Sequence, residues 1–297
     1  MKQLLGRAAV VLGAVIVAVT LWAFAEPRLV LETPRHTVEL PGLTAEQDGL
    51  EVAVLSDLQV GMWWANTGMV DRAVEAIVAG DPDLVLLPGD FLYSTEPDVQ
   101  TQVDMVLDLL DPLVDSGIPT LAVLGNHDHE AGGSQEIAAA LEAAGIDVLL
   151  NESVVVPVAG TDGSDEGEDR LHVVGVGPAR PGLADPEQAV AGVPDGAPRV
   201  VMMHNPSAFV DLPAGTGPLS VAGHTHCGQI AVPFAPHSSY LGLTEEEEVV
   251  ADGWAPEDHG AAGNDLFVTC GVGFSLAPVR FNAPPQVVFF ELVAPSG

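Results

Sequence analysis

The sequence has 297 residues, of which 47% are apolar, and its formal net charge is −33 at pH 7. A chain of this length can bury one large hydrophobic core. Its acidic surface would repel DNA or RNA, so we expect no nucleic-acid partner and no nuclease acting on long polymers.

The N-terminal segment is predicted to enter a membrane. Residues 8–25 form an apolar stretch of 18 residues without a charged side chain, and Lys2 and Arg7 precede it. At ~1.5 Å per residue this is just long enough for a membrane-spanning helix. Positive charge before it and acidic sequence after it predict a single-pass anchor in the cell membrane, with the N-terminus inside and the remainder extracytoplasmic. Ala23-Phe24-Ala25 also fits a signal cleavage site, so secretion after cleavage is the alternative.

We expect three parts along the chain. They are an anchor or signal segment (1–25), a linker with a lead-in strand (26–46) and the main domain (47–297).

The main domain alternates strand and helix patterns. Short apolar runs rich in valine and leucine, bounded by Gly, Pro, Asp or Asn, predict buried strands at 52–55, 84–87, 121–124, 200–203 and 219–222. Helical patterns occupy 68–79, 98–115 and 135–144. This alternation predicts an α/β fold with a largely parallel sheet and ligands at the carboxyl ends of its strands. After residue 154 strands follow one another, which predicts a second sheet packed on the first.

A polar motif follows each predicted strand. In chain order they are Asp57-Leu58-Gln59, Gly89-Asp90, Gly125-Asn126-His127-Asp128, His204 and Gly223-His224-Thr225-His226. A sheet can converge these carboxylates, amides and imidazoles at one edge. Mixed Asp, Asn and His ligation suits Mn, Fe or Zn better than Ca or Mg, so we expect two divalent or mixed-valence transition metal ions.

The motif order resembles the calcineurin-like metallophosphoesterase superfamily, whose pattern is DxH, GD, GNH(D/E), H and GHxH. The flanking sequence, including Pro278-Val279-Arg280-Phe281, resembles the bacterial membrane-associated subgroup of YkuE or YaeI type. The resemblance implies a four-layered α/β/β/α sandwich with two metals. One metal would be held by Asp57, Gln59, Asp90 and His226, and the other by Asp90, Asn126, His204 and His224. It also implies that His127 is the catalytic histidine, assisting the leaving group.

One position departs from the family pattern, because Gln59 stands where the superfamily usually has histidine. An amide oxygen is a weaker donor than imidazole, so the first metal site is looser or differently filled. The block Gly89-Asp90-Phe91-Leu92-Tyr93 resembles the GDxxY block of purple acid phosphatases, in which the tyrosine binds iron, so Tyr93 is a hypothetical further ligand. The alternative function is a catalytically impaired metal-binding or sensing protein on the same fold.

Other features leave alternatives open. Three states are open for Cys227 and Cys270. They are a disulfide between the two residues, two buried thiols or, least favoured, a thiolate metal ligand. Trp63 and Trp64 either line a rim near Gln59 or cap the core. The stretches 160–170 and 234–264 lack periodicity and are interpreted as loops, the second placed to cover the site.

Together these features predict a metal-dependent phosphoesterase hydrolysing phosphodiester, pyrophosphate or phosphomonoester bonds. Its substrate would be a small molecule or a lipid. The oligomeric state is left open.

Overall fold

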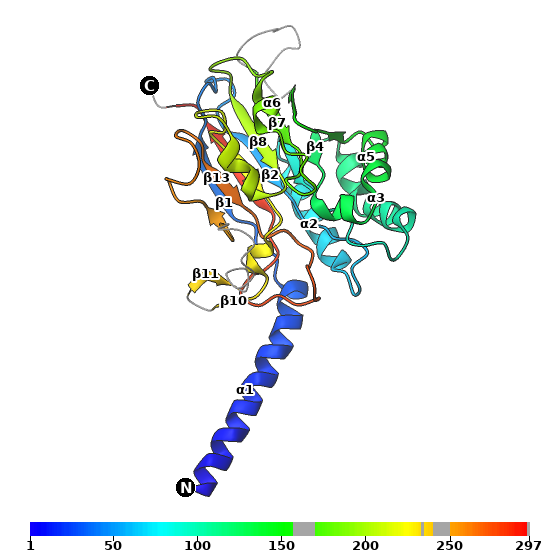
Figure 1. Cartoon of the computed structure of the whole chain (residues 1–297), viewed down its shortest axis with the longest axis vertical. Coiled ribbons are helices and arrows are strands. Elements are labelled where there is room, and N and C mark those ends of the chain that lie inside the picture. The colour runs from blue at the N-terminus through cyan, green and yellow to red at the C-terminus, as the bar shows by residue number, and fades with distance from the viewer. Residues whose placement is uncertain (157–169, 233–234, 240–249, 296–297) are drawn as a thin grey trace.

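The computed structural model describes residues 1–156, 170–232, 235–239 and 250–295 (Figure 1). The predicted loop 160–170 falls almost entirely outside the described residues, as does part of the stretch 234–264. Within the described residues, two six-stranded sheets form the body of the molecule.

The first sheet has the strand order β1-β14-β2-β3-β4-β5. Its strands are β1 (Arg35–Glu39), β14 (Val288–Val293), β2 (Leu50–Val54), β3 (Leu84–Pro88), β4 (Thr120–Val123) and β5 (Asp147–Val148). From β2 to β5 neighbouring strands are parallel, while β14 is antiparallel to β2. Every residue of β3 and β4 is buried, because one face of the sheet meets helices and the other meets the second sheet.

The second sheet has the order β12-β13-β9-β8-β7-β6. Its strands are β12 (Gly253–Trp254), β13 (Leu266–Val268), β9 (Ser220–Ala222), β8 (Arg199–Met203), β7 (His172–Val176) and β6 (Glu152–Val155). The four inner strands are parallel, and the two edge strands are antiparallel to their neighbours. A further hairpin joins β10 (Ala231–Val232) to β11 (Ala235–Ser239).

Helices complete the four layers. On the first sheet lie α2 (Thr67–Gly80), α3 (Val99–Ser116), the short α4 (Asn126–Glu130) and α5 (Ser134–Ala143), while α6 (Pro186–Val190) and the 3-10 helix η1 (Pro206–Asp211) lie on the second. In α2 the buried residues Met69, Val70, Ala73, Val74 and Ile77 recur at helical spacing and pack into the first core. A second core fills the space between the sheets. The predicted α/β/β/α architecture is therefore confirmed, together with its five strands and three helices.

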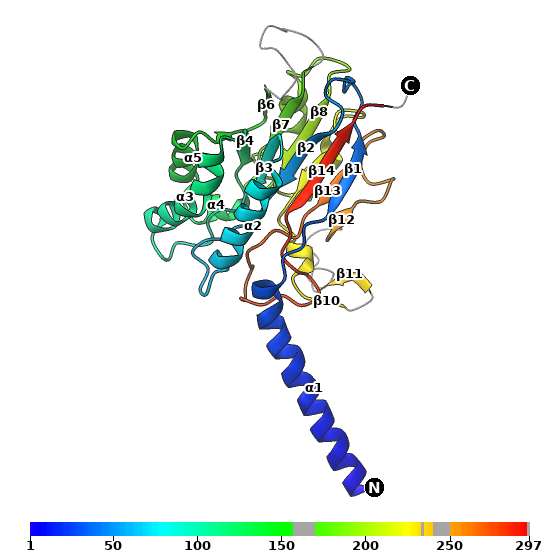
Figure 2. The same cartoon turned by 180° about the vertical axis from the view of Figure 1, so that it is seen from behind.

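The N-terminal helix α1 (Lys2–Leu29) projects from the body in both views (Figures 1 and 2). The segment Gln3–Leu29 contains an 18-residue window with a mean hydropathy of 2.5, and no residue of this window is buried. By length and composition, α1 is a candidate membrane span or signal sequence. Its last turns touch the body, where Glu26 and Pro27 are buried.

Candidate metal centre

Each polar motif lies just beyond the carboxyl end of a strand. Asp57 follows β2, Asp90 follows β3, Asn126 opens α4 after β4, His204 follows β8 and His224 follows β9. Because the two sheets face each other, these strand ends meet at one edge of the sandwich. All eight predicted site residues therefore lie in one neighbourhood.

The backbone turns sharply at this edge. Asp57, Gln59, Asp90, His224 and His226 all have a left-handed backbone, with φ between 46° and 73°. Such conformations are costly for residues with a Cβ atom and cluster at functional sites. The glycines of the motifs allow the loops to approach one another, since a Cβ at Gly125 would collide with the Asp90 carboxylate and one at Gly223 with Ser56 and Asp57.

Four side chains converge at the first cluster. Donor atoms of Asp90, His204 and His224 all lie within 4.8 Å of one another. His204 Nε2 is 3.2 Å from Asp90 Oδ2, 3.1 Å from Asn126 Oδ1 and 3.2 Å from His224 Nδ1. The other nitrogen of His204, Nδ1, lies 2.7 Å from the Pro88 carbonyl oxygen and donates to it, which leaves Nε2 free to bind a metal.

The second cluster joins the first through Asp90. Gln59 Nε2 donates to Asp90 Oδ2 at 3.2 Å and lies 3.1 Å from His226 Nε2, which in turn is 3.6 Å from Asp57 Oδ1. Gln59 Oε1 is buried without a hydrogen-bond partner. Rotation of the amide would aim this orphaned oxygen at the same point, where a cation would satisfy it. The donor set thus fits metal binding.

His127 sits at the rim of the two clusters. Its backbone N–H donates to Asp90 Oδ1 at 2.9 Å, and its ring stacks on Tyr93 with centroids 5.0 Å apart. His127 Nδ1 lies 3.0 Å from the Tyr93 carbonyl oxygen and donates to it, so Nε2 is the atom that can exchange a proton with a ligand. The Tyr93 hydroxyl accepts a hydrogen bond from the Leu276 N–H at 3.2 Å, and Tyr93 as a metal ligand stays a prediction.

Comparison with known proteins identifies this arrangement. The model of the calcineurin-like phosphoesterases matches residues 50–228, which contain all five motifs. The chain belongs to this phosphoesterase family. The family implies divalent metal ions, in agreement with the donor set.

Relatives match over most of the chain. Phosphodiesterase YaeI of Escherichia coli is 30% identical over 82% of this chain and 82% of its own. The uncharacterized metallophosphoesterase YkuE of Bacillus subtilis is 24% identical over 91% of this chain and 87% of its own. An uncharacterized metallophosphoesterase of Aquifex aeolicus is 27% identical over 88% of this chain and 92% of its own. The predicted subgroup is thereby confirmed.

Charged groups in the candidate metal centre shift one another's pKa values. Burial alone would lower the pKa of His204, but the neighbouring Asp90 carboxylate raises it to about 9. Burial would likewise raise the pKa of Asp90, and His204 holds it below its usual range. Burial and the His204 cation lower the pKa of His224 to about 3. Without metal, His204 therefore carries a proton at neutral pH, and a metal must displace that proton.

Asp128 fastens the two central motif loops together. This fully buried carboxylate accepts hydrogen bonds from the backbone N–H groups of Asp90 at 3.1 Å, Leu92 at 2.8 Å and Gly125 at 2.8 Å. These bonds position the backbone of the loops that carry Asp90 and Asn126, so Asp128 acts as an orienting partner of the candidate ligands.

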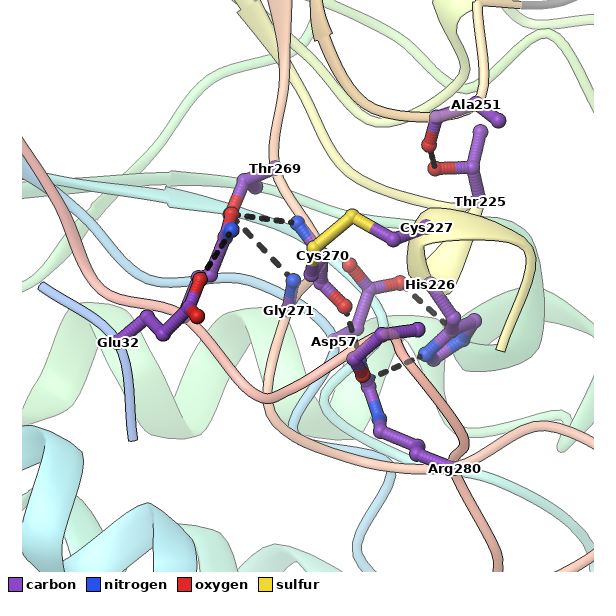
Figure 3. The surroundings of a disulfide bond; sticks show 12 residues. Glu32, Asp57, Thr225, His226, Cys227, Ala251, Thr269, Cys270, Gly271 and Arg280 are labelled. Carbon is purple, nitrogen blue, oxygen red and sulfur yellow. Dashed lines mark hydrogen bonds and ion pairs between the residues drawn. A yellow bond between two sulfur atoms is a disulfide. The ribbon is translucent and has the colours of Figure 1, made fainter. Parts of the chain in front are cut away.

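Arg280 is a site residue to which sequence reasoning assigned no role. Its fully buried guanidinium donates to the carbonyl oxygens of Cys270, Gly273 and Ala283 and lies 3.1 Å from His226 Nδ1 (Figure 3). Arginine can only donate, so Nδ1 accepts and a neutral His226 carries its proton on Nε2. Metal binding through Nε2 would then require that this proton move to Nδ1 and that the Arg280 hydrogen bond to Nδ1 be given up.

Cys227 and Cys270 form a disulfide beside this group (Figure 3). Cys227 directly follows His226, and Cys270 precedes Gly271, whose backbone packs against Asp57. The bond ties the loop that carries His226 to the loop that packs against Asp57. It also removes both sulfurs as thiolate ligands, which settles the three alternatives left open by the sequence.

Proposed function

We propose that this protein is a phosphodiesterase with two transition metal ions (Mn, Fe or Zn) at the edge described above. The first would be held by Asp57, Gln59, Asp90 and His226, and the second by Asp90, Asn126, His204 and His224. The observation that carries the proposal is the position of Asp90 Oδ2, which faces both Gln59 and His204 and so can serve both sites. The name of YaeI supports diester hydrolysis, and pyrophosphates and monoesters are the other substrate classes.

When bound, the metals would polarise the phosphoryl oxygens and lower the pKa of the attacking water. Protein side chains supply the leaving-group proton and hold the motif loops in place. His127, held through Nδ1 on the Tyr93 carbonyl, delivers a proton from Nε2 to the leaving oxygen. Water's oxygen replaces the leaving group on phosphorus, and the alcohol departs with that proton. Asp128 keeps Asp90 and Gly125 in register during the reaction.

The protein is proposed to be anchored in the cell membrane by α1, with its N-terminus inside and the phosphoesterase domain outside. The length and hydropathy of α1 support the anchor. The Cys227–Cys270 disulfide supports an oxidising compartment outside the cytoplasm. The proposal keeps the division of the chain into an anchor (1–25), a linker with a lead-in strand (26–46) and the main domain (47–297).

The test uses the full chain in detergent, stripped with a chelator and resupplied with Mn, Fe or Zn. Hydrolysis of bis(p-nitrophenyl) phosphate should require metal and should fall by about 10²–10⁴-fold in His127→Ala. His259→Ala is the matched control, because His259 stacks on Phe209 away from the site. Hydrolysis that survives both chelation and His127→Ala would refute the proposal.

A second function is favoured by one feature, Gln59 in the position where the family pattern has a histidine, with its amide bonded to Asp90. In this case the protein would hold one metal at Asp90, Asn126, His204 and His224 and serve as a metal-binding or sensing protein. Folded protein that retains one metal and hydrolyses no phosphoester with any metal would establish this alternative.

A further inference from the structure

The metal edge and the end of α1 are joined by one loop, 275–283, here called the bridging loop. On one side its backbone bonds to α1: Arg280 N donates to Ala23 O at 3.0 Å, and Ala283 N donates to Glu26 Oε1 at 3.1 Å. Arg28 in turn donates to Pro278 O at 3.2 Å. The last turns of α1 are thus fixed to the body through this loop.

The other side of the bridging loop bonds to the site. Leu276 N donates to the hydroxyl of Tyr93, whose ring stacks on His127. Gln229, which directly follows the last motif and η2 (His226–Gly228), accepts from Ser275 N at 2.7 Å and donates to Ala277 O at 2.9 Å. The proposed metal edge is therefore the edge at which α1 leaves the body.

A second contact fixes α1 at the same edge. The loop after the first motif carries Trp64, whose ring lies 5.7 Å from Phe24 and 4.4 Å from the Arg28 guanidinium carbon. Asn66 donates to the carbonyl oxygen of Pro27 at 2.9 Å. With α1 held on two sides, the body cannot swing freely about the helix.

Large apolar side chains stand exposed around this edge. Trp63 is 63% exposed, Trp64 61% and Leu276 72%. Ile230, one residue beyond Gln229, is also exposed. We call these four residues the interfacial rim. Exposed tryptophans next to the end of an apolar helix are typical of a membrane interface, where the indole is half wet and half apolar.

A cavity lies beside Trp63 of the rim and extends to Tyr93. Its volume is about 620 Å³, and its lining includes Met62, Trp63, Tyr93 and Met105. Tyr93 connects the cavity to His127 through ring stacking. A mostly apolar cavity that is separated from His127 by one aromatic ring suits a molecule with a phosphate at one end and hydrocarbon at the other.

We propose that the interfacial rim rests on the bilayer from which α1 emerges, and that the site hydrolyses the phosphodiester of lipids in that leaflet. The occupant of the rim is the lipid surface, because the rim is continuous with the exposed apolar face of α1. The lipid's phosphorus gains the oxygen of water, and one phosphorus–oxygen ester bond breaks as the alcohol leaves with a proton. Both parts rest on the proposed function, the substrate on the phosphodiesterase site and the position of the rim on α1 as a membrane anchor.

The position of the rim is tested with the full chain reconstituted in vesicles of brominated phosphatidylcholine. One variant keeps Trp63 alone, with the other three tryptophans replaced by phenylalanine. The control keeps Trp254 alone, which is 40% exposed on the edge strand β12. Bromine should quench Trp63 at least threefold more strongly than Trp254. Equal quenching would overturn the membrane-facing rim.

The substrate is tested by comparing two probes, vesicles of phosphatidylethanolamine, phosphatidylglycerol and cardiolipin, and the soluble bis(p-nitrophenyl) phosphate. Leu276→Asp should lower the ratio of lipid to aryl diester hydrolysis at least tenfold. Val210→Asp, on the exposed face of η1, should leave this ratio unchanged.

The outcomes separate the two proposals. Aryl diester hydrolysis without lipid hydrolysis, or an equal ratio in both variants, would overturn the lipid substrate alone. If neither probe is hydrolysed, the proposed function fails and the lipid substrate with it. Fluorescence quenching still decides the position of the rim in that case.

Discussion

Asp128→Asn tests the idea that one buried carboxylate holds the metal edge together. An asparagine oxygen can take the place of Oδ2 and keep the bonds from Asp90 and Gly125. The amide nitrogen then faces the Leu92 N–H, so two donors meet and the buried N–H is left without an acceptor. That orphan costs about 1–3 kcal/mol. Burial and the neighbouring Asp90 raise the pKa of Asp128 to about 7, so above this pH the two remaining bonds also lose a charged acceptor and we expect a total loss of about 2–4 kcal/mol.

The assay measures thermal unfolding and bound metal on the same samples. The unfolding midpoint should fall by about 5–10 °C, and metal affinity by about 10–100-fold because Asp90 is no longer held in place. Asp185→Asn is the matched control, since Asp185 caps α6 by accepting from Gln188 N and asparagine caps equally well. An unfolding midpoint and a metal content like those of Asp185→Asn would refute the reasoning.

Three further predictions concern the metals and the disulfide. Gln59→His should raise the metal content per chain, measured by elemental analysis, because imidazole is the stronger donor; a fall in both metal content and activity would show a site specialised for glutamine. Metal affinity, measured by calorimetry, should fall about tenfold per pH unit below pH 9, because the metal displaces the proton of His204. A metal affinity that does not change between pH 6 and pH 8 would contradict this. Reduction of the Cys227–Cys270 bond, which spans 43 residues, should destabilise the fold by about 4 kcal/mol; an unfolding midpoint unaffected by reductant would contradict that estimate.

The central strands could be predicted because their apolar composition indicates that they are buried. The runs that became β3, β4 and β8 consist of apolar residues that are buried on both faces. The place of β14 could not be predicted in this way. It inserts between β1 and β2, far away along the chain, and is antiparallel to β2. A local pattern carries no information on such a long-range partner.

The same distinction holds for the candidate site. Side chains such as Asp90 and His204 were predictable because each closes a strand and the sheet brings the strand ends together. Arg280 was not, since nothing near it in the sequence shows that it lies behind His226. The sequence marks Glu26 more clearly than Arg280, because this acid directly follows the apolar stretch 8–25. Its partner Ala283 is nevertheless 257 residues away.

The left-handed backbone at the motifs explains why the site and its scaffold depend on each other. Each such residue costs about 1–2 kcal/mol. The turn at Asp57 and the turn at His224 meet because the His224 N–H donates to the Asp57 carboxylate. In the same way the His127 N–H donates to Asp90. The side chains that would bind metal are therefore also the acceptors that hold the strained loops, so a change in one ligand alters both metal affinity and backbone. Arg280 and the Cys227–Cys270 disulfide also hold the motif loops in place, which allows this strain to persist.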